Sequence, residues 1–315
     1  IKKSMKKNIL IIKFGGLGDF ILSLHAINSV RKFHDKDDIT LLTEGPYDLI
    51  ANKSGWFKDI IKIKRSTFYF FDRVQIKSRI KESMFDIIYD FQTSKRSSSY
   101  HSIFKNTKTK WSGIAEGCSD YHLNQNRNQM HTLERQKDQL TFSKINKSFD
   151  LKVDWLFQSK IKNDDIGKPF VVLAPGGSAK RKYKRIPSEI FMEISKVLEK
   201  NKILTVLVGT KEEKKICKSI QNQCNSIINL CEKLDILELA ALAGQSEVAI
   251  GNDTGPMHLF GLSGCKTIVF FTKFSNPDLC SPRGKDVQVI KFDGNKSNLM
   301  RKIISFLSDW NEQLS

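Results

Sequence analysis

Residues 248–260 read VAIGNDTGPMHLF, a buried-type strand followed directly by turn residues and one histidine. Asp253 ends the predicted strand, and the Thr254 hydroxyl can cap a helix that begins at Gly255. Backbone N–H groups at a helix N-terminus bind anions, and a glycine there leaves its N–H accessible. His258 lies in the first helical turn, where it either contacts the same anion or is an ordinary buried histidine. The spacing therefore predicts an anion site at this junction.

A second junction, PGGSAKRKYKRIP at residues 175–187, follows the predicted strand FVVLA. Backbone N–H groups together with Lys or Arg side chains can bind a diphosphate when no metal neutralises its charge. The basic run is therefore either a phosphate site or a solvated loop. Its five cations occupy six positions: Lys180, Arg181, Lys182, Lys184 and Arg185.

A third junction, FGGLGDF at residues 14–20, lies between a predicted strand and a predicted helix. Gly15, Gly16 and Gly18 let the backbone approach a ligand closely. Their spacing matches neither the dinucleotide fingerprint nor the phosphate-binding P-loop. Asp19 falls in the predicted first helical turn. It is either a carboxylate that favours a helix N-terminus or a general base at the rim of a cleft.

Strands and helices alternate along most of the chain, which predicts an α/β fold with doubly wound, mainly parallel sheets. In such folds ligands bind outside the carboxyl ends of the strands, where all three junctions lie. The predicted strands are 8–14, 38–44, 59–63, 85–91, 170–177, 202–209, 226–230, 247–252 and 266–271. The predicted helices are 18–33, 47–54, 131–145, 187–201, 210–224, 235–245, 255–262 and 297–314.

A length of 315 residues suits two domains. We expect an N-terminal domain at 1–160 and a C-terminal domain at 168–295. The remaining residues, 296–315, form a predicted helix that packs back on the body. The polar segment 158–169 is the predicted linker.

The composition is that of a globular protein, but the net charge is +18. This surplus favours anionic partners such as nucleic acid, phosphorylated small molecules or an acidic membrane surface. The six cysteines form no CxxC pair and no zinc spacing, so free thiols are expected. No apolar run reaches the ~18 residues needed to span a bilayer, and the N-terminal segment does not match a signal peptide. We therefore expect a cytoplasmic protein.

Together the junctions resemble the motifs of glycosyltransferase family 9, the ADP-heptose:lipopolysaccharide heptosyltransferase family, over most of the chain. GLGDFILSL is similar to the family's G-D-x-x-L motif, and KRIP resembles its K-[RH]-W-P motif. HTLERQKDQL is similar to the helix before the family's second domain. GNDTGPMHL resembles D-T-G-x-x-H-L, the most specific of the four.

The resemblance implies a GT-B fold, in which two Rossmann-like doubly wound domains face a central cleft, the first binding mainly the acceptor and the second the donor. It implies an inverting, metal-independent transfer without a cofactor, from an ADP-sugar such as ADP-heptose to a lipopolysaccharide core hydroxyl. Asp19 matches the catalytic base, and Gly15, Gly16 and Gly18 belong to the acceptor-side loop. The implied donor-binding residues are Gly177, Ser178, Lys184, Glu212 (or its neighbour Glu213), Asp253, Thr254, Gly255, Pro256, Met257 and His258.

The chain departs from the family pattern in four respects, one of which is the unusually basic loop between Ser178 and Lys184. These departures leave the donor sugar and the acceptor open. His25 stands where the family often has Pro, Ile186 where it has Trp, and FTKFSNP where a Gly-Pro-Thr turn is common. One alternative is the same fold and mechanism with a different nucleotide sugar or glycan acceptor. The others are a non-catalytic nucleotide-sugar binder and a basic nucleic-acid-binding protein, for which no motif is present, so nucleic acid is not an expected partner.

Residues 58–110 carry 13 Lys or Arg against 5 Asp or Glu and include the aromatic run TFYFF at 67–71. A basic, aromatic surface suits peripheral contact with the anionic inner face of the plasma membrane. The alternative is a basic surface over an aromatic core strand.

Overall fold

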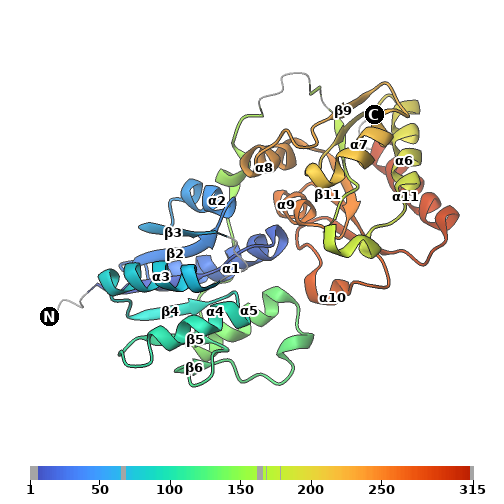
Figure 1. Cartoon of the computed structure of the whole chain (residues 1–315). Coiled ribbons are helices and arrows are strands. Elements are labelled where there is room, and N and C mark those ends of the chain that lie inside the picture. Colours follow the sequence, from blue (N-terminus) through green and yellow to red (C-terminus); the bar gives the residue numbers. More distant parts are fainter. Residues whose placement is uncertain (1–5, 65–68, 162–165, 168, 178, 313–315) are drawn as a thin grey trace. The chain divides into compact units, whose positions relative to one another are not determined.

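The computed structural model describes residues 6–64, 69–161, 166–167, 169–177 and 179–312. The chain divides into two compact units, unit 1 (Ile1–Leu156) and unit 2 (Phe157–Ser315). Each unit contains a six-stranded sheet with helices (Figure 1). Within the described residues every pairing between these strands is parallel. The predicted α/β class with doubly wound parallel sheets is therefore confirmed.

In unit 1 the strand order is β3-β2-β1-β4-β5-β6, so the order reverses between β1 and β4. Ligands bind at such reversals in open parallel sheets. The strands are β1 (Asn8–Ile12), β2 (Asp38–Glu44), β3 (Asp59–Ile63), β4 (Ile87–Asp90), β5 (Lys110–Gly113) and β6 (Asp120–Tyr121). The helices are α1 (Leu17–Phe33), α2 (Tyr47–Ser54), α3 (Tyr69–Ser83), α4 (Lys95–Ser99) and α5 (Thr132–Phe142), with short 3₁₀ turns η1 (Tyr100–Ile103), η2 (Arg127–Gln129) and η3 (Asp154–Phe157).

Unit 2 repeats the same order, β12-β11-β10-β7-β8-β9, and its reversal lies between β7 and β10. The strands are β7 (Phe170–Ala174), β8 (Leu204–Leu207), β9 (Ile227–Asn229), β10 (Val248–Asn252), β11 (Lys266–Phe271) and β12 (Val287–Lys291). The helices are α6 (Ser188–Lys200), α7 (Lys214–Gln221), α8 (Ile236–Gln245), α9 (Gly255–Ser263), α10 (Pro277–Cys280) and α11 (Lys296–Glu312), with 3₁₀ turns η4 (Ala179–Lys184) and η5 (Lys211–Glu213).

The last helix, α11, packs on α6 and belongs to the core of unit 2. Its buried residues recur at helical spacing, so one face of the helix packs on the core, while the opposite face is mostly polar and includes the exposed Ile304. The buried residues of this face are Leu299, Met300, Ile303, Leu307 and Trp310.

One local prediction is confirmed here, and another is wrong. Asp235 and Glu238 form the predicted capping box of α8. The reading of 67–71 as an aromatic core strand is wrong, because α3 begins at Tyr69 and Phe71 is exposed on it; residues 67 and 68 lie outside the described part of the chain. β5, β6 and β12 were not predicted, since their short sequences mix polar and apolar residues.

The six cysteines are free thiols, as predicted. In the part of the chain that the structure describes, no group of three or more His, Cys, Asp or Glu side chains could hold a metal ion. A search of the same residues for a helix long and apolar enough to cross a membrane found none.

Candidate functional site

The carboxyl edge of the unit 2 sheet brings together the loops that follow β7, β8 and β10. β10 and β8 lie on either side of β7, because both pair with it. The strand order reverses between β7 and β10, the position at which sheets of this type bind ligands. The predicted junctions at 175–187 and 248–260 are therefore neighbours in the folded unit.

Asn252 is buried at the end of β10, and its side chain links these two junctions by hydrogen bonds. Its Nδ2 donates to the Pro175 carbonyl oxygen over 2.8 Å, and its Oδ1 accepts from the Ile186 N–H over 3.1 Å. A buried amide needs such partners, so both bonds hold the loop after β7 against the end of β10. As a result, Lys184 lies beside Asp253.

Lys184 and Asp253, two residues predicted to bind the donor, form an ion pair. Lys184 Nζ lies 3.1 Å from Asp253 Oδ2, and the two side chains are only 18% and 10% exposed. Charge interactions in such a partly dry position are stronger than in open water. An ammonium group has three donors, so an anionic ligand can bind beside the carboxylate.

A second ion pair joins the loop after β7 to the loop after β8. Arg185 Nη2 lies 2.8 Å from Glu213 Oε1 and also donates to the Gly177 carbonyl oxygen. Glu213 Oε2 accepts from the N–H and the O–H of Thr210, over 2.9 and 2.6 Å. A Cβ on Gly176 would lie 2.5 Å from Glu213 Cγ, so this close approach requires glycine. This pair was not predicted from the sequence, although the capping-box spacing of Thr210 and Glu213 was a usable signal.

The other predicted residues of these loops lie in different surroundings. Glu213 is buried within its ion pair, whereas Glu212 is exposed to solvent. Of the two acids considered, Glu212 is thus the one that a ligand can reach. Gly177 is half-buried, and Ser178 lies outside the described residues.

The N-terminus of α9 differs from the prediction in one respect. Thr254 precedes the helix, but its side chain makes no capping hydrogen bond, so that prediction is wrong. A backbone bond closes the first turn instead, since the Met257 N–H donates to the Thr254 carbonyl oxygen over 3.1 Å. The Met257 side chain is buried against Gly251, where a Cβ would lie 2.5 Å from its sulfur. The remaining predicted residues of this turn are half-buried or buried: Gly255, Pro256 and His258.

In unit 1 the loop after β1 turns at Gly16, whose φ of +79° lies in the left-handed region that favours glycine. Asp19 lies in the first turn of α1, as predicted, and is exposed. Its carboxylate folds back over the turn, because a Cβ on Gly16 would lie 2.9 Å from Asp19 Oδ2. Gly18 is half-buried in the same turn. The turn thus presents one accessible carboxylate at the carboxyl end of β1.

Gly15 is explained by packing within unit 1. A Cβ there would lie 2.8 Å from Tyr47 Cε2 and 3.3 Å from Glu44 Oε2. Tyr47 stacks on Phe20 with ring centroids 5.1 Å apart, and Glu44 Oε1 lies 2.6 Å from Arg96 Nη1. The loops after β1 and β2 therefore meet too closely for any larger residue.

Charged side chains that were not predicted from the sequence lie in buried or half-buried positions near Asp19. Burial lowers the pKa of Lys13, and the carboxylates of Asp19 and Asp90 oppose this shift. Burial also lowers the pKa of Arg135, again opposed by Asp19. Burial raises the pKa of Asp90 to about 6, although two backbone N–H groups donate to its Oδ1. The only signal in the sequence was a charged residue at or directly after the end of each of two apolar strands, β1 and β4.

Residues 73–303 match the sequence model of glycosyltransferase family 9 (heptosyltransferase). Over 138 residues the chain is 31% identical to lipooligosaccharide heptosyltransferase 2 of Campylobacter jejuni. That match covers 40% of this chain and 41% of the relative, so it spans less than half the length of either protein.

Two solved structures have the same fold over almost the whole chain. E. coli ADP-heptose LPS heptosyltransferase II superposes with a TM-score of 0.77 at 16% identity, covering 98% of this chain and 99% of that one. E. coli heptosyltransferase WaaC with ADP superposes with a TM-score of 0.76 at 17% identity, covering 96% and 99%. The predicted GT-B fold class, two parallel six-stranded sheets with helices, is thereby confirmed.

Proposed function

The chain belongs to glycosyltransferase family 9, and on this premise we propose that it transfers a heptosyl group from ADP-heptose to a hydroxyl group of a lipopolysaccharide core. The names of the Campylobacter and E. coli relatives support the sugar and the class of acceptor. The E. coli structure that contains ADP supports the nucleotide.

The observation that carries the proposal is the Lys184–Asp253 pair at the carboxyl edge of unit 2. It lies beside the N-terminus of α9, whose first-turn N–H groups and positive dipole end favour a bound anion. An ammonium group and a helix N-terminus together suit the diphosphate of a nucleotide sugar. We assign Gly177, Ser178, Glu212 and the residues from Asp253 to His258 to the same donor site.

The proposed reaction is a single displacement. Asp19 accepts the proton of the acceptor hydroxyl while the hydroxyl oxygen attacks the anomeric carbon of the donor sugar. The bond between that carbon and the diphosphate oxygen breaks, and its electron pair leaves with the nucleotide diphosphate. Attack from the opposite face inverts the anomeric configuration. Lys184, the α9 N-terminus and His258 stabilise the developing charge, and we propose that no metal ion is required.

The surroundings of Asp19 support its role as the base. Its carboxylate is exposed at the end of β1, where a hydroxyl can reach it, while Lys13 and Arg135 lie close enough to interact with it electrostatically. A general base must lie within reach of the proton that it accepts, and an exposed carboxylate at a strand end meets this requirement.

We also propose that unit 1 contacts an anionic membrane surface. α3 exposes two apolar side chains three residues apart, Phe71 and Val74, which are 74% and 53% exposed and share a helix face. The same helix exposes Lys77 and Arg79. Exposed apolar residues beside basic ones are typical of helices that lie on membranes.

The proposed function is tested by a transfer assay with ADP-heptose and a lipopolysaccharide core acceptor. We expect Asp19→Asn to lower kcat by about 10²–10⁴-fold, because a general base contributes about that much. Asp35→Asn is the matched control, since Asp35 is exposed in the turn after α1 and the substitution removes the same charge. If Asp19→Asn keeps its rate within about twofold, the assigned base is wrong. If wild type transfers sugar only from another nucleotide sugar, the donor assignment is wrong.

A further inference from the structure

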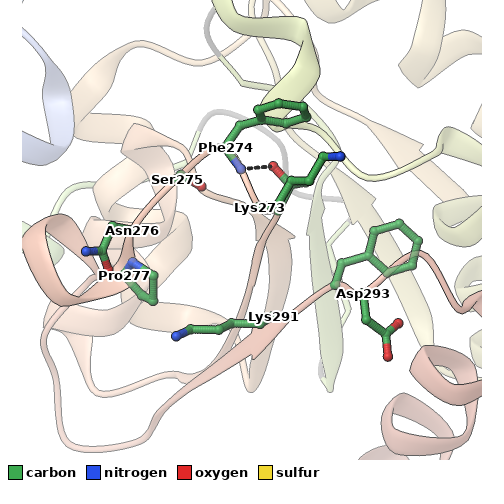
Figure 2. Close-up of a pocket in the computed structure, with 9 residues that line it drawn as sticks. Lys273, Phe274, Ser275, Asn276, Pro277, Lys291 and Asp293 are labelled. Carbon is green, nitrogen blue, oxygen red and sulfur yellow. Dashed lines mark hydrogen bonds between the residues drawn. The ribbon is translucent and has the colours of Figure 1, made fainter.

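A depression of about 560 Å³ lies at the carboxyl ends of β11 and β12, on the same edge of the unit 2 sheet as the Lys184–Asp253 pair (Figure 2). Its walls come from the loop after β11, including Phe274 and Asn276, and from the end of β12, including Lys291. The loop after β11 reads FTKFSNP over residues 271–277.

Three groups that can donate hydrogen bonds line the depression. Lys291 is exposed and forms no ion pair among the described residues. Asn276 uses its Oδ1 to accept from the Asp278 N–H over 3.0 Å, which leaves its Nδ2 to donate. The Ser275 hydroxyl oxygen is buried and has no hydrogen-bond partner in the described part of the chain. Figure 2 shows Lys291 pointing toward the side on which Asn276 and Pro277 lie.

The lining contains one carboxylate, that of Asp293, and it accepts a hydrogen bond from the backbone. Its Oδ1 accepts from the Asn295 N–H over 2.8 Å, and Figure 2 places it away from Asn276. The second lysine, Lys273, lies over the ring of Phe274 with its ammonium 5.2 Å from the ring centroid. The side occupied by Lys291 and Asn276 therefore carries unpaired donors and positive charge, which suits an anionic group.

Aromatic rings complete the lining and connect it to the donor site. Phe274 is 54% exposed and meets Tyr183 edge to face, with centroids 5.1 Å apart. Thr272 Oγ1 donates to the Tyr183 carbonyl oxygen over 3.3 Å, and Tyr183 directly precedes Lys184. Exposed aromatic rings offer an apolar surface to the C–H groups of a sugar. The depression is thus physically joined to the loop that carries Lys184.

From these contacts we propose that the depression is a subsite for an acidic sugar residue of a saccharide ligand, bound through a phosphate or carboxylate group. Lys291 and Asn276 bind the anionic group, and the Phe274 ring covers a face of the sugar. The proposal rests on the proposed function only in taking the ligand to be a saccharide.

Saturation-transfer-difference NMR on the full chain tests the subsite with three probes: glucose 6-phosphate, glucuronate and neutral glucose. We expect at least one acidic sugar to bind wild type and glucose not to bind. Lys291→Met and Asn276→Asp should each weaken binding by about tenfold or more, because each removes a hydrogen bond to a charged group. Asn276→Asp keeps the oxygen that accepts from Asp278. Binding of glucose 6-phosphate alone identifies phosphate as the recognised group, and binding of glucuronate alone identifies carboxylate.

Lys302→Met is the matched control, because Lys302 is exposed on α11 and lies outside the depression; it should bind like wild type. Saturating ADP should not displace the acidic sugars. The inference is overturned if glucose binds as well as they do, if neither acidic sugar binds, if both pocket variants bind like wild type, or if ADP displaces the probe. ADP binding is measured on the same samples. If ADP binds but the acidic sugars do not, the subsite is wrong and the proposed donor site stands.

Discussion

Among single residues, the buried charges of unit 1 are the least expected feature. Lys13 is 4% exposed and Asp90 is fully buried, at the adjacent ends of β1 and β4. Burial favours the neutral form of both groups, while their mutual attraction favours the charged forms. Charged groups are retained in such positions at a cost to stability, which is typical of residues that support a site.

The raised pKa of Asp90 predicts a definite pH dependence of stability. The pKa rises from an ordinary 3.8 to about 6 in the folded protein, so between these values the folded state binds more protons than the unfolded state. The contribution of Asp90 to the free energy of unfolding should therefore fall as the pH rises from about 4 to about 6. In urea unfolding, Asp90→Asn should gain stability relative to wild type across this window. A constant difference between the two proteins from pH 4 to 7 would contradict the prediction, and Asp35→Asn serves as the exposed control.

At the scale of elements, the proposed donor site depends on how two loops are held together at the reversal between β7 and β10. Asn252 links the carbonyl of Pro175 to the N–H of Ile186, and Arg185 links the same loop to Glu213. No element of this site is a long helix or strand. Its geometry therefore rests on buried side-chain hydrogen bonds more than on regular structure.

Removing the link at Asn252 should be costly. Asn252→Ala leaves a buried carbonyl and a buried N–H without their partner, which should lower the free energy of unfolding by about 2–4 kcal/mol. It should also weaken ADP binding, since Lys184 would no longer be held beside Asp253. Asn201→Ala, which removes an exposed bond to the Val197 carbonyl, should cost less than about 1 kcal/mol. Equal losses in urea unfolding for the two variants would contradict the assigned role of Asn252.

The sequence predicted the elements far better than the contacts between them. Alternating strands and helices were readable from apolar runs, and the basic run and the turn at Asp253 marked the two loops that the fold brings together. The pairing of Lys184 with Asp253 was not readable, because it depends on β10 lying beside β7 in a strand order that no local pattern encodes. The choice between Glu212 and Glu213 likewise depends on burial. The core strand predicted at 67–71 (TFYFF) was wrong because aromatic residues generally favour strands. In the structure Phe71 lies on an exposed face of a helix.

For the whole molecule, the net charge of +18 is the property that most affects partners. A surplus of this size speeds encounter with anionic surfaces and makes binding depend on salt. In the membrane contact that we propose, the exposed apolar pair on α3, Phe71 and Val74, is the point in unit 1 that touches the membrane surface.

Sedimentation with phosphatidylglycerol liposomes tests this membrane contact. At low salt we expect wild type to sediment with the liposomes, and high salt or the double variant Phe71→Ser/Val74→Ser should reduce the bound fraction several-fold. Leu123→Ser is the control, since Leu123 is equally exposed elsewhere in unit 1. A protein that stays in the supernatant at low salt has no such contact.

We propose that Lys184, beside Asp253, holds the diphosphate of a nucleotide sugar without a metal ion. Calorimetric titration with ADP, UDP and GDP, each with and without EDTA, tests it most directly. We predict that ADP binds best, that EDTA changes nothing, and that Lys184→Ala weakens binding by about tenfold or more, whereas Lys182→Ala, at an exposed position in the same basic run, does not. Failure of all three nucleotides to bind, or equal binding by wild type and Lys184→Ala, would contradict the claim.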